Sequence, residues 1–262
     1  MTLEQSVREQ IAADLWHAER SATAIDRPSD AHPGIDVIDA YEIALININR
    51  RLRAGASVAG HKVGLASLAM QKMMGVDEPD YGHLLDDMQY HEHTPIDTAR
   101  LCSPRVEVEV GFILGDDLRG SGCTNADVAA AVEWVVPAIE LIDSRIVDWR
   151  ITLCDTIADN ASSCGWILGE QRVAPTDIDI GNVDAVLSRN GAVVAKGNSS
   201  AVLGHPLTAV SWLARTVAGF GVRLRKGDII LPGTATQAID VAGGDHFVAE
   251  FAGLGSVTLD FR

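Results

Sequence analysis

Two glutamates that alternate with valines offer the clearest chemistry in the chain. Residues 104–110 read PRVEVEV, with valines at every second position and Glu107 and Glu109 between them. This alternation predicts a strand, in which both glutamates point to the same face. Two close carboxylates repel each other unless a cation lies between them, and oxygen ligands suit a hard divalent ion such as Mg²⁺ or Mn²⁺. The alternative is an edge strand whose acidic face is solvated.

A third carboxylate, Glu140, is the strongest single oddity in the sequence. Residues 135–143, VVPAIELID, predict a second apolar strand, and Glu140 is the charge in its interior. A buried carboxylate must be paired with a cation or bound to a metal. Glu140 is therefore either another metal ligand or one half of a salt bridge with Arg145 or Arg105.

Further polar groups lie between apolar segments. A short strand over 57–65 carries Lys62, and the stretch EPDYG at 78–82 has the composition of a turn that holds Asp80. Asp, Asn and Ser residues gather in 155–163, where helix caps and turns are the ordinary interpretation. The sequence PGTAT at 232–236 predicts a loop whose amides and hydroxyls could hold an anion.

His91 and His93 flank a glutamate in another polar stretch, and an imidazole pair that binds a metal is the alternative to a solvated loop there. The polar context and the proline at position 95 favour the loop.

The elements that must position these groups follow from hydrophobic periodicity and capping residues. Helices are predicted over 3–20, 36–55, 67–74, 124–134 and 206–219. Strands are predicted over 57–65, 103–114, 135–143, 229–231, 246–251 and 256–261, with a type I′ hairpin turn at 189–192. The fold class is therefore α+β, with an N-terminal helical layer over 1–56 and a metal-binding, β-rich catalytic unit over 57–262. Neither a Gly-x-Gly-x-x-Gly nor a Gly-x-Ser-x-Gly motif occurs.

Composition limits the partners. The 262 residues carry a net charge of -15, which argues against nucleic acid and anionic membranes as partners. An anionic substrate would need a local positive group. The four cysteines form no Cys-x-x-Cys pair, and the N-terminal residues, with their mixed charges, resemble neither a signal peptide nor a membrane span. These features predict a cytoplasmic protein with free thiols.

Taken together, seven motifs resemble those of one enzyme family. In chain order they are GHKVGL (60–65), EPDYG (78–82), PRVEVE (104–109), PAIELIDSR (137–145), DNAS (159–162), LGHP (203–206) and GDIILPG (227–233). Their order and spacing resemble the 2-hydroxypenta-2,4-dienoate hydratases of aromatic and steroid meta-cleavage pathways, in the hydratase/decarboxylase branch of the fumarylacetoacetate hydrolase superfamily. The resemblance covers nearly the whole chain.

The resemblance implies a mixed, rolled β-sheet core with flanking helices and a homo-oligomer, often a pentamer or decamer. It implies roles residue by residue: metal ligands at Glu107, Glu109 and Glu140; catalytic groups at Lys62, Asp80 and Ser162; substrate-binding groups at Leu65 and Thr234. The backbone amide of Leu65 would hold the substrate carboxylate, with the Thr234 hydroxyl at the same end.

The implied reaction adds water to a 2-hydroxy-2,4-dienoate and yields a 4-hydroxy-2-oxo acid, assisted by Mg²⁺ or Mn²⁺. Lys62 and Asp80 would transfer protons and orient water, and we expect a lowered pKa for a lysine that is partly buried beside a cation. Two alternatives stay open: decarboxylation of a 2-oxo-3-enedioate such as 4-oxalocrotonate, and a non-catalytic subunit that binds a metal or a 2-oxo acid. Association with other enzymes of the pathway is a further expectation.

Overall fold

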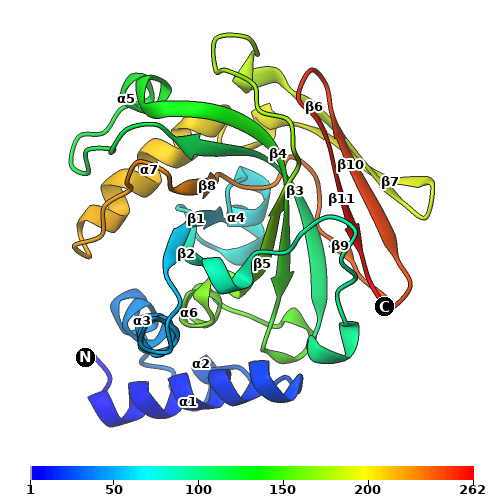
Figure 1. The fold of residues 1–262 in the computed structure, drawn as a ribbon. Coiled ribbons are helices and arrows are strands. Elements are labelled where there is room, and N and C mark those ends of the chain that lie inside the picture. Colours follow the sequence, from blue (N-terminus) through cyan, green and yellow to red (C-terminus); the bar gives the residue numbers. More distant parts are fainter. Residues whose placement is uncertain (1) are drawn as a thin grey trace.

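A computed structural model describes residues 2–262 (Figure 1). Its α-helices are α1 (Gln5–Ser21), α2 (Pro28–Ala31), α3 (Val37–Arg53), α4 (Leu68–Met74), α5 (Asn125–Ala131), α6 (Leu153–Ala158) and α7 (Pro206–Ala218). Its strands are β1 (Val58–Gly64), β2 (Asp80–Leu85), β3 (Pro104–Leu114), β4 (Val132–Asp143), β5 (Ser163–Leu168), β6 (Asp184–Arg189), β7 (Ala192–Asn198), β8 (Ile229–Leu231), β9 (Ile239–Asp240), β10 (His246–Phe251) and β11 (Gly255–Asp260).

The strands of this described part form two sheets. The larger has the order β2-β1-β8-β3-β4-β5, with β9 paired to β3, and the smaller has the order β11-β10-β6-β7. Only β1 and β8 run parallel among the named strand pairs of the larger sheet, so the sheet is mixed. In Figure 1 the larger sheet curls around α4, and the smaller sheet packs along one side of it. The α+β class with a rolled, mixed sheet is confirmed.

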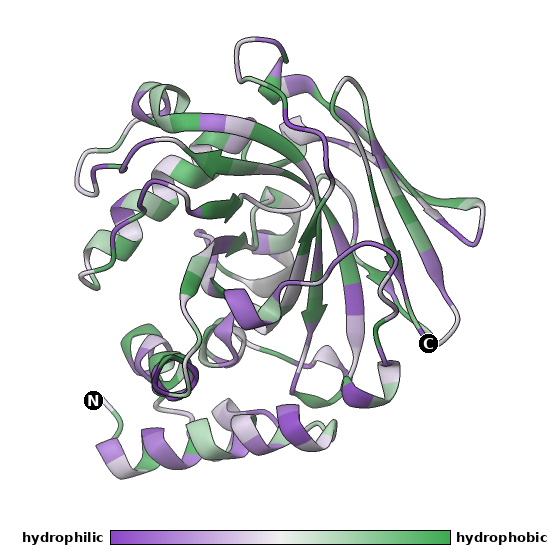
Figure 2. Cartoon of the chain, viewed as in Figure 1, coloured by the Kyte–Doolittle hydropathy of each residue, from purple (hydrophilic) through white to green (hydrophobic). Residues whose placement is uncertain are grey.

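The helices near the N-terminus form a layer below the larger sheet (Figure 1). Helix α1 packs on α3, and α3 packs on α6, which in turn contacts β2. Asp36 begins α3 with a reciprocal capping box, since its carboxylate accepts from the Asp39 N–H at 2.9 Å. Along α1 hydrophilic and hydrophobic residues alternate in Figure 2, as expected for a helix with one buried face. The division into units 1–56 and 57–262 stays a prediction.

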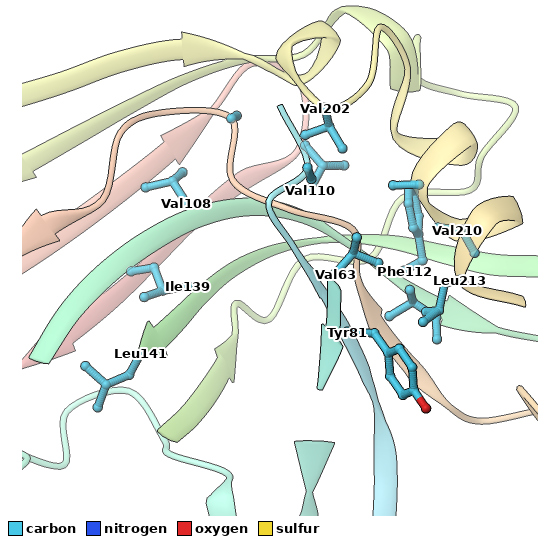
Figure 3. Packing of buried hydrophobic residues seen from close by; sticks show 14 of the residues in the cluster. Val63, Tyr81, Val108, Val110, Phe112, Ile139, Leu141, Val202, Val210 and Leu213 are labelled. Carbon is cyan, nitrogen blue, oxygen red and sulfur yellow. The ribbon is translucent and has the colours of Figure 1, made fainter. Parts of the chain in front are cut away.

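Strand β3 lies in the interior of the larger sheet, between β8 and β4. The side chains of Val106, Val108 and Val110 on one face, and of Glu107 and Glu109 on the other, are all buried. The alternative of a solvated edge strand is therefore wrong. Figure 3 shows Val108 and Val110 in one hydrophobic cluster with Ile139 of β4 and Val63 of β1. Burial of this apolar face fixes the register that turns the glutamates to the opposite face.

Strands β6 and β7 form the predicted hairpin. Asn190 and Gly191 have φ angles of 53° and 81°, the left-handed pair that a type I′ turn needs. At the far end of β7 the backbone of Gly197 lies so close to the 233–237 loop that an added Cβ atom would overlap the Ala235 carbonyl oxygen. Glycine is required there, and the contact attaches the smaller sheet to the loop that follows β8.

Two local predictions are wrong. Asp80 belongs to strand β2 and pairs with Gly64 of β1, whereas a turn was predicted at 78–82; the proline at position 79 precedes the strand rather than bending it. The helix that begins at Thr124 ends at Ala131, and residues 132–134 already belong to β4. Val132 is buried in the sheet, so tertiary packing outweighs the helical pattern. Within residues 2–262 the helices are all too short or too polar to cross a membrane.

Candidate metal centre and active site

Strands β3 and β4 bring three glutamates together. Glu107 and Glu140 are direct cross-strand partners, and Glu109 lies two residues further along the same face of β3. One oxygen from each carboxylate lies within 4.8 Å of the others, and all three side chains are buried. This separation is about the span of oxygen ligands that share one hard divalent ion.

The protein balances the charges of this glutamate cluster only in part, through Lys62. Within the described residues, one oxygen of Glu109 and both oxygens of Glu140 have no hydrogen-bond partner; the other Glu109 oxygen accepts from the Gly233 N–H at 2.7 Å. Burial and mutual repulsion raise the pKa of Glu109 well above its ordinary value. Burial also raises the pKa of Glu107, and it raises that of Glu140 to about 7 despite the opposing effect of Lys62. Unpartnered, buried, oxygen-only ligands fit a bound divalent cation.

Lys62 of β1 is the cation nearest to this cluster in the described residues. Its Nζ lies 3.5 Å from an oxygen of Glu140, and both side chains are buried. Burial lowers the pKa of Lys62, but Glu140, Glu107 and Asp80 together raise it above its ordinary value. The sequence predicts a lowered pKa for Lys62 on the assumption that a cation is bound nearby. Such a cation would offset the effect of these carboxylates on the pKa.

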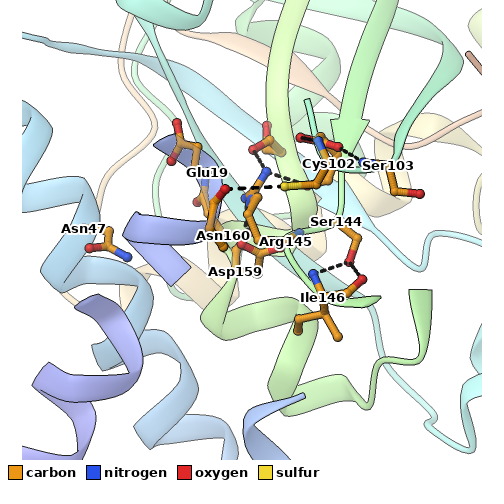
Figure 4. Close-up of polar contacts among 12 residues, drawn as sticks. Glu19, Asn47, Cys102, Ser103, Ser144, Arg145, Ile146, Asp159 and Asn160 are labelled. Atoms are coloured by element: carbon orange, nitrogen blue, oxygen red, sulfur yellow. Dashed lines mark hydrogen bonds and ion pairs between the residues drawn. The ribbon is translucent and has the colours of Figure 1, made fainter. Parts of the chain in front are cut away.

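The arginines proposed as partners of Glu140 are engaged elsewhere. Arg105 lies 2.7 Å from Asp240, and Arg145 lies 2.5 Å from Asp159 (Figure 4). The salt-bridge alternative for Glu140 through either arginine is therefore wrong.

Asp80 begins β2 opposite the last residue of β1. Its carboxylate packs against Gly64 so closely that any side chain at position 64 would overlap it. Burial raises the pKa of Asp80, while the Lys62 ammonium acts in the opposite direction. One Asp80 oxygen has no hydrogen-bond partner within the described residues. The net effect is a pKa of Asp80 above its ordinary value, because burial outweighs the attraction of the ammonium.

Ser162 is held by a short, unusual turn. Asn160, Ala161 and Ser162 have φ angles of 53°, 52° and 54°, three left-handed residues in succession. Asn160 fixes this turn to β2, because its side-chain oxygen accepts from the His83 N–H at 2.8 Å and its amide donates to the His83 carbonyl at 2.9 Å. The Ser162 hydroxyl is buried without a partner among the described residues. Such strain is typical of positions that fix a functional group.

Leu65 and Thr234 line a cleft of about 240 Å³, together with Glu107. Leu65 has a φ angle of 53°, so the chain turns sharply as β1 ends. The Thr234 hydroxyl accepts from the Val108 N–H at 3.2 Å and lies 3.3 Å from the Val108 carbonyl. Thr234 therefore fixes its loop to β3, and a substrate contact would require this hydroxyl to reorient. Lys62, Asp80 and Ser162 are buried and do not belong to the lining of this cleft.

A larger cavity, of about 720 Å³, lies elsewhere, between the end of α1 and the segment before β3. It contains none of the predicted site residues. The predicted site residues Leu65, Glu107 and Thr234 line the smaller cleft instead.

Two residues near the site gave no recognisable signal in the sequence. Ser163, directly after the left-handed turn, lowers the pKa of Glu140. Lys196 of β7 lines the cleft although it is 130 residues from Ala66 on the opposite wall. Neither contact could be inferred without the pairing of strands. His91 and His93 lie in an irregular segment, as the loop interpretation predicted.

The model of the fumarylacetoacetate (FAA) hydrolase C-terminal family matches residues 74–262. The chain belongs to the fumarylacetoacetate hydrolase family, and the rolled sheet with its glutamate cluster is its version of that fold.

Curated relatives cover nearly the whole chain. It is 44% identical over 255 residues to a 2-keto-4-pentenoate hydratase of Paraburkholderia xenovorans, and the match covers 97% of this chain and 95% of the relative. It is 40% identical over 249 residues to a 2-hydroxyhexa-2,4-dienoate hydratase of Comamonas testosteroni, with 94% of each covered. Among solved structures, the 4-oxalocrotonate decarboxylase of Pseudomonas putida, complexed with magnesium and adipate, superposes with a TM-score of 0.97 at 34% identity, covering 100% of this chain and 99% of that one.

Proposed function

We propose that the protein is a divalent-metal-dependent hydro-lyase that adds water to a 2-hydroxy-2,4-dienoate and forms a 4-hydroxy-2-oxo acid. The observation that carries the proposal is the buried glutamate cluster, whose unpartnered oxygens lie beside Lys62 and Asp80. Relatives at 40% and 44% identity are named as hydratases of this substrate class, which supports the same reaction here.

Glu107, Glu109 and Glu140 would hold the cation, Mg²⁺ or Mn²⁺. When bound, the cation supplies Lewis-acid stabilisation of negative charge on the 2-oxygen of the substrate. Side chains and backbone amides of the protein would bind the substrate and transfer protons. The Leu65 amide would hold the carboxylate together with the Thr234 hydroxyl, once that hydroxyl turns from the Val108 backbone toward the cleft. The burial of Lys62 and Asp80 would keep bulk water from the reacting carbons.

Lys62 and Asp80 are the proposed proton-transfer groups. They lie on neighbouring strands, and each perturbs the pKa of the other. Protonation at C5 of the dienol gives a conjugated 2-oxo acid, and water then adds at C4. The Ser162 hydroxyl would orient that water, and its burial without a partner in the described residues supports this role.

Decarboxylation of a 2-oxo-3-enedioate is the second candidate, because a solved structure that superposes with a TM-score of 0.97 is named as a 4-oxalocrotonate decarboxylase. Both reactions use the same stabilisation of an enolate, so the glutamate cluster does not distinguish them. The higher identity to hydratases favours hydration.

The deciding experiment incubates the purified protein with 2-hydroxypenta-2,4-dienoate and Mg²⁺ or Mn²⁺ and follows loss of the dienol absorbance. We expect metal-dependent loss with 4-hydroxy-2-oxopentanoate as the product. Release of carbon dioxide from 4-oxalocrotonate without hydration of the dienoate would move the assignment to the decarboxylase. Full turnover in excess EDTA would remove the metal from the proposal.

Variants assign the roles. Glu107→Ala, Glu109→Ala and Glu140→Ala should each reduce turnover at least about a hundredfold, because each removes a ligand of the cation that would stabilise the reacting oxygen. Glu133→Gln is the matched control: it also lies on β4 but is exposed, and its turnover should equal that of the wild type. Lys62→Ala should lower kcat while metal still binds, and a wild-type kcat would exclude Lys62 from the chemistry.

The finer expectations form part of the same proposal. We propose a cytoplasmic homo-oligomer, a pentamer or decamer, that acts in meta-cleavage catabolism of aromatic or steroid compounds beside other pathway enzymes. Sedimentation equilibrium of the purified protein tests the subunit count, and a monomer would contradict it.

A further inference from the structure

The cleft that leads to the glutamate cluster has an uneven distribution of charge. Its lining is made of apolar, small and hydroxyl-bearing residues and one amide side chain, Gln237, apart from two charged side chains, Glu107 and Lys196. Glu107 belongs to the proposed metal ligands, so Lys196 is the one cation of the described lining that is free to meet a ligand. The protein carries a net charge of -15, and an anionic substrate therefore approaches against an unfavourable field.

Lys196 comes from the smaller sheet, whereas the glutamates come from the larger one. It lies on β7, where it pairs with Val186 of β6, and its side chain is exposed. The only other lining residue from this region is Ala201, just beyond β7. The smaller sheet thus contributes a positive charge to the outer part of the cleft.

The backbone of Lys196 is fixed in this position from two sides. Next to it, Gly197 packs directly on the Ala235 carbonyl of one cleft wall. Slightly further along, the Leu203 N–H donates to the Ala66 carbonyl of the other wall at 3.0 Å. A residue held between both walls keeps its side chain at the opening, and its long, flexible stem lets the ammonium follow a ligand.

The orientation of the substrate follows from what is buried and what is open. The proposed proton-transfer groups, Lys62 and Asp80, are buried and do not line the cleft, so in the proposed reaction the reacting carbons point away from the opening, toward these groups. The carboxylate end of the substrate then remains in the cleft. Leu65, Thr234 and Lys196 all line this cleft.

We propose that Lys196 is a specificity-determining residue that pairs with the C1 carboxylate of the 2-oxo or 2-hydroxy acid substrate at the cleft opening. This assignment rests on the proposed function, because the direction of the substrate is set by the roles of Lys62 and Asp80. An exposed ion pair is weak, and its loss changes affinity only a few-fold.

The test compares Lys196→Gln and Lys196→Arg with the wild type, all loaded with Mg²⁺. Lys226→Gln is the matched control, since Lys226 is also an exposed lysine but lies outside the cleft lining. For 2-hydroxypenta-2,4-dienoate we expect Lys196→Gln to raise KM about threefold to fivefold with kcat nearly unchanged. Lys196→Arg should retain most of the affinity, and the salt dependence of kcat/KM should be smaller in the glutamine variant.

A second readout does not depend on turnover. Binding of pyruvate, the smallest 2-oxo acid with the same carboxylate end, is titrated by calorimetry in the presence of Mg²⁺, and Lys196→Gln should weaken it by a similar factor. Unchanged KM and unchanged pyruvate binding would overturn the assignment. So would a loss confined to the dicarboxylate 4-oxalocrotonate, because Lys196 would then bind the distal carboxylate. If the wild type fails to hydrate the dienoate while Lys196→Gln still weakens pyruvate binding, the proposed reaction is wrong and the carboxylate contact stands.

Discussion

Two groups of buried charge lie at the same end of strand β4, and they are treated in opposite ways. Just beyond the strand, Arg145 donates to the Asp159 carboxylate and to the carbonyls of Asp143, Ser163 and Asp159 (Figure 4). Within the strand, both oxygens of Glu140 have no hydrogen-bond partner in the described residues. Burial is nearly complete in both places.

The difference separates a structural role from a functional one. A buried ion pair whose donors and acceptors are satisfied holds its surroundings in one arrangement, and it has no capacity left for a ligand. The glutamate cluster keeps unpartnered oxygens at a cost in stability, which is typical of sites that bind something the chain does not supply. The comparison can be tested at each group.

The largest expected effect is at the satisfied pair. Arg145→Met leaves the Asp159 carboxylate buried without its cation, so the free energy of unfolding should fall by about 3 to 5 kcal/mol, measured by urea unfolding in EDTA. The double variant Arg145→Met/Asp159→Leu should recover part of that loss, because the orphaned charge is gone. A fall of less than about 1 kcal/mol in the single variant would contradict the structural role.

The next largest effect is the pH dependence of stability that arises from a buried histidine, His83. Burial keeps this side chain neutral, whereas Arg145 is charged and paired with Asp159. Burial lowers the pKa of His83 to about 4, against an ordinary value of 6.5. Above pH 6.5 the ring is neutral in both states, but as the pH falls toward 4 the unfolded chain binds a proton that the folded protein does not. His83 should therefore remove about 3 kcal/mol of stability over this window.

The measurement compares urea unfolding of the wild type and His83→Phe at pH 7 and pH 4.5, in EDTA so that metal binding does not contribute. The variant should lose less stability on acidification, since other titrating groups are common to both proteins. Equal losses would show that His83 is protonated freely in the folded state.

The stabilisation of the folded protein by a bound metal is slightly smaller. It depends on the glutamate cluster and not on the Arg145–Asp159 pair. Mg²⁺ or Mn²⁺ at a free concentration a hundredfold above its Kd should stabilise the folded protein by about 2.7 kcal/mol, which raises Tm by about 5 to 10 °C. Glu109→Gln should show no such rise, and its metal-free form should be at least as stable as the wild type because one buried repulsive charge is removed. A rise of the same size in Glu109→Gln would place the ion elsewhere.

Much of this arrangement could be predicted from local pattern. The same-face glutamates of β3 follow from period-two alternation, and the caps at Asp36 and Thr124 follow from side chains that compete for backbone N–H groups. The type I′ turn at 190–191 follows from residues that tolerate a positive φ.

What depends on long-range pairing could not be predicted. The opposition of Glu107 and Glu140 is a matter of register between β3 and β4, and the parallel contact of β1 with β8 joins segments about 170 residues apart. Asp80 has no strand signal of its own and becomes β2 because β1 offers it a partner. Lys196 reaches the cleft only because two sheets meet there. Family resemblance supplied the roles that pattern could not.

The two hydrogen bonds between the Asn160 side chain and the His83 backbone affect how readily the protein aggregates in concentrated solution. Strand β2 ends the larger sheet, and the outward peptide groups of an end strand can recruit a strand from another molecule and start aggregation. The side-chain amide of Asn160 occupies the N–H and C=O of His83 as a neighbouring strand would. The turn that fixes Ser162 therefore also shields a sheet margin, so the position of this buried hydroxyl and resistance to aggregation depend on the same asparagine.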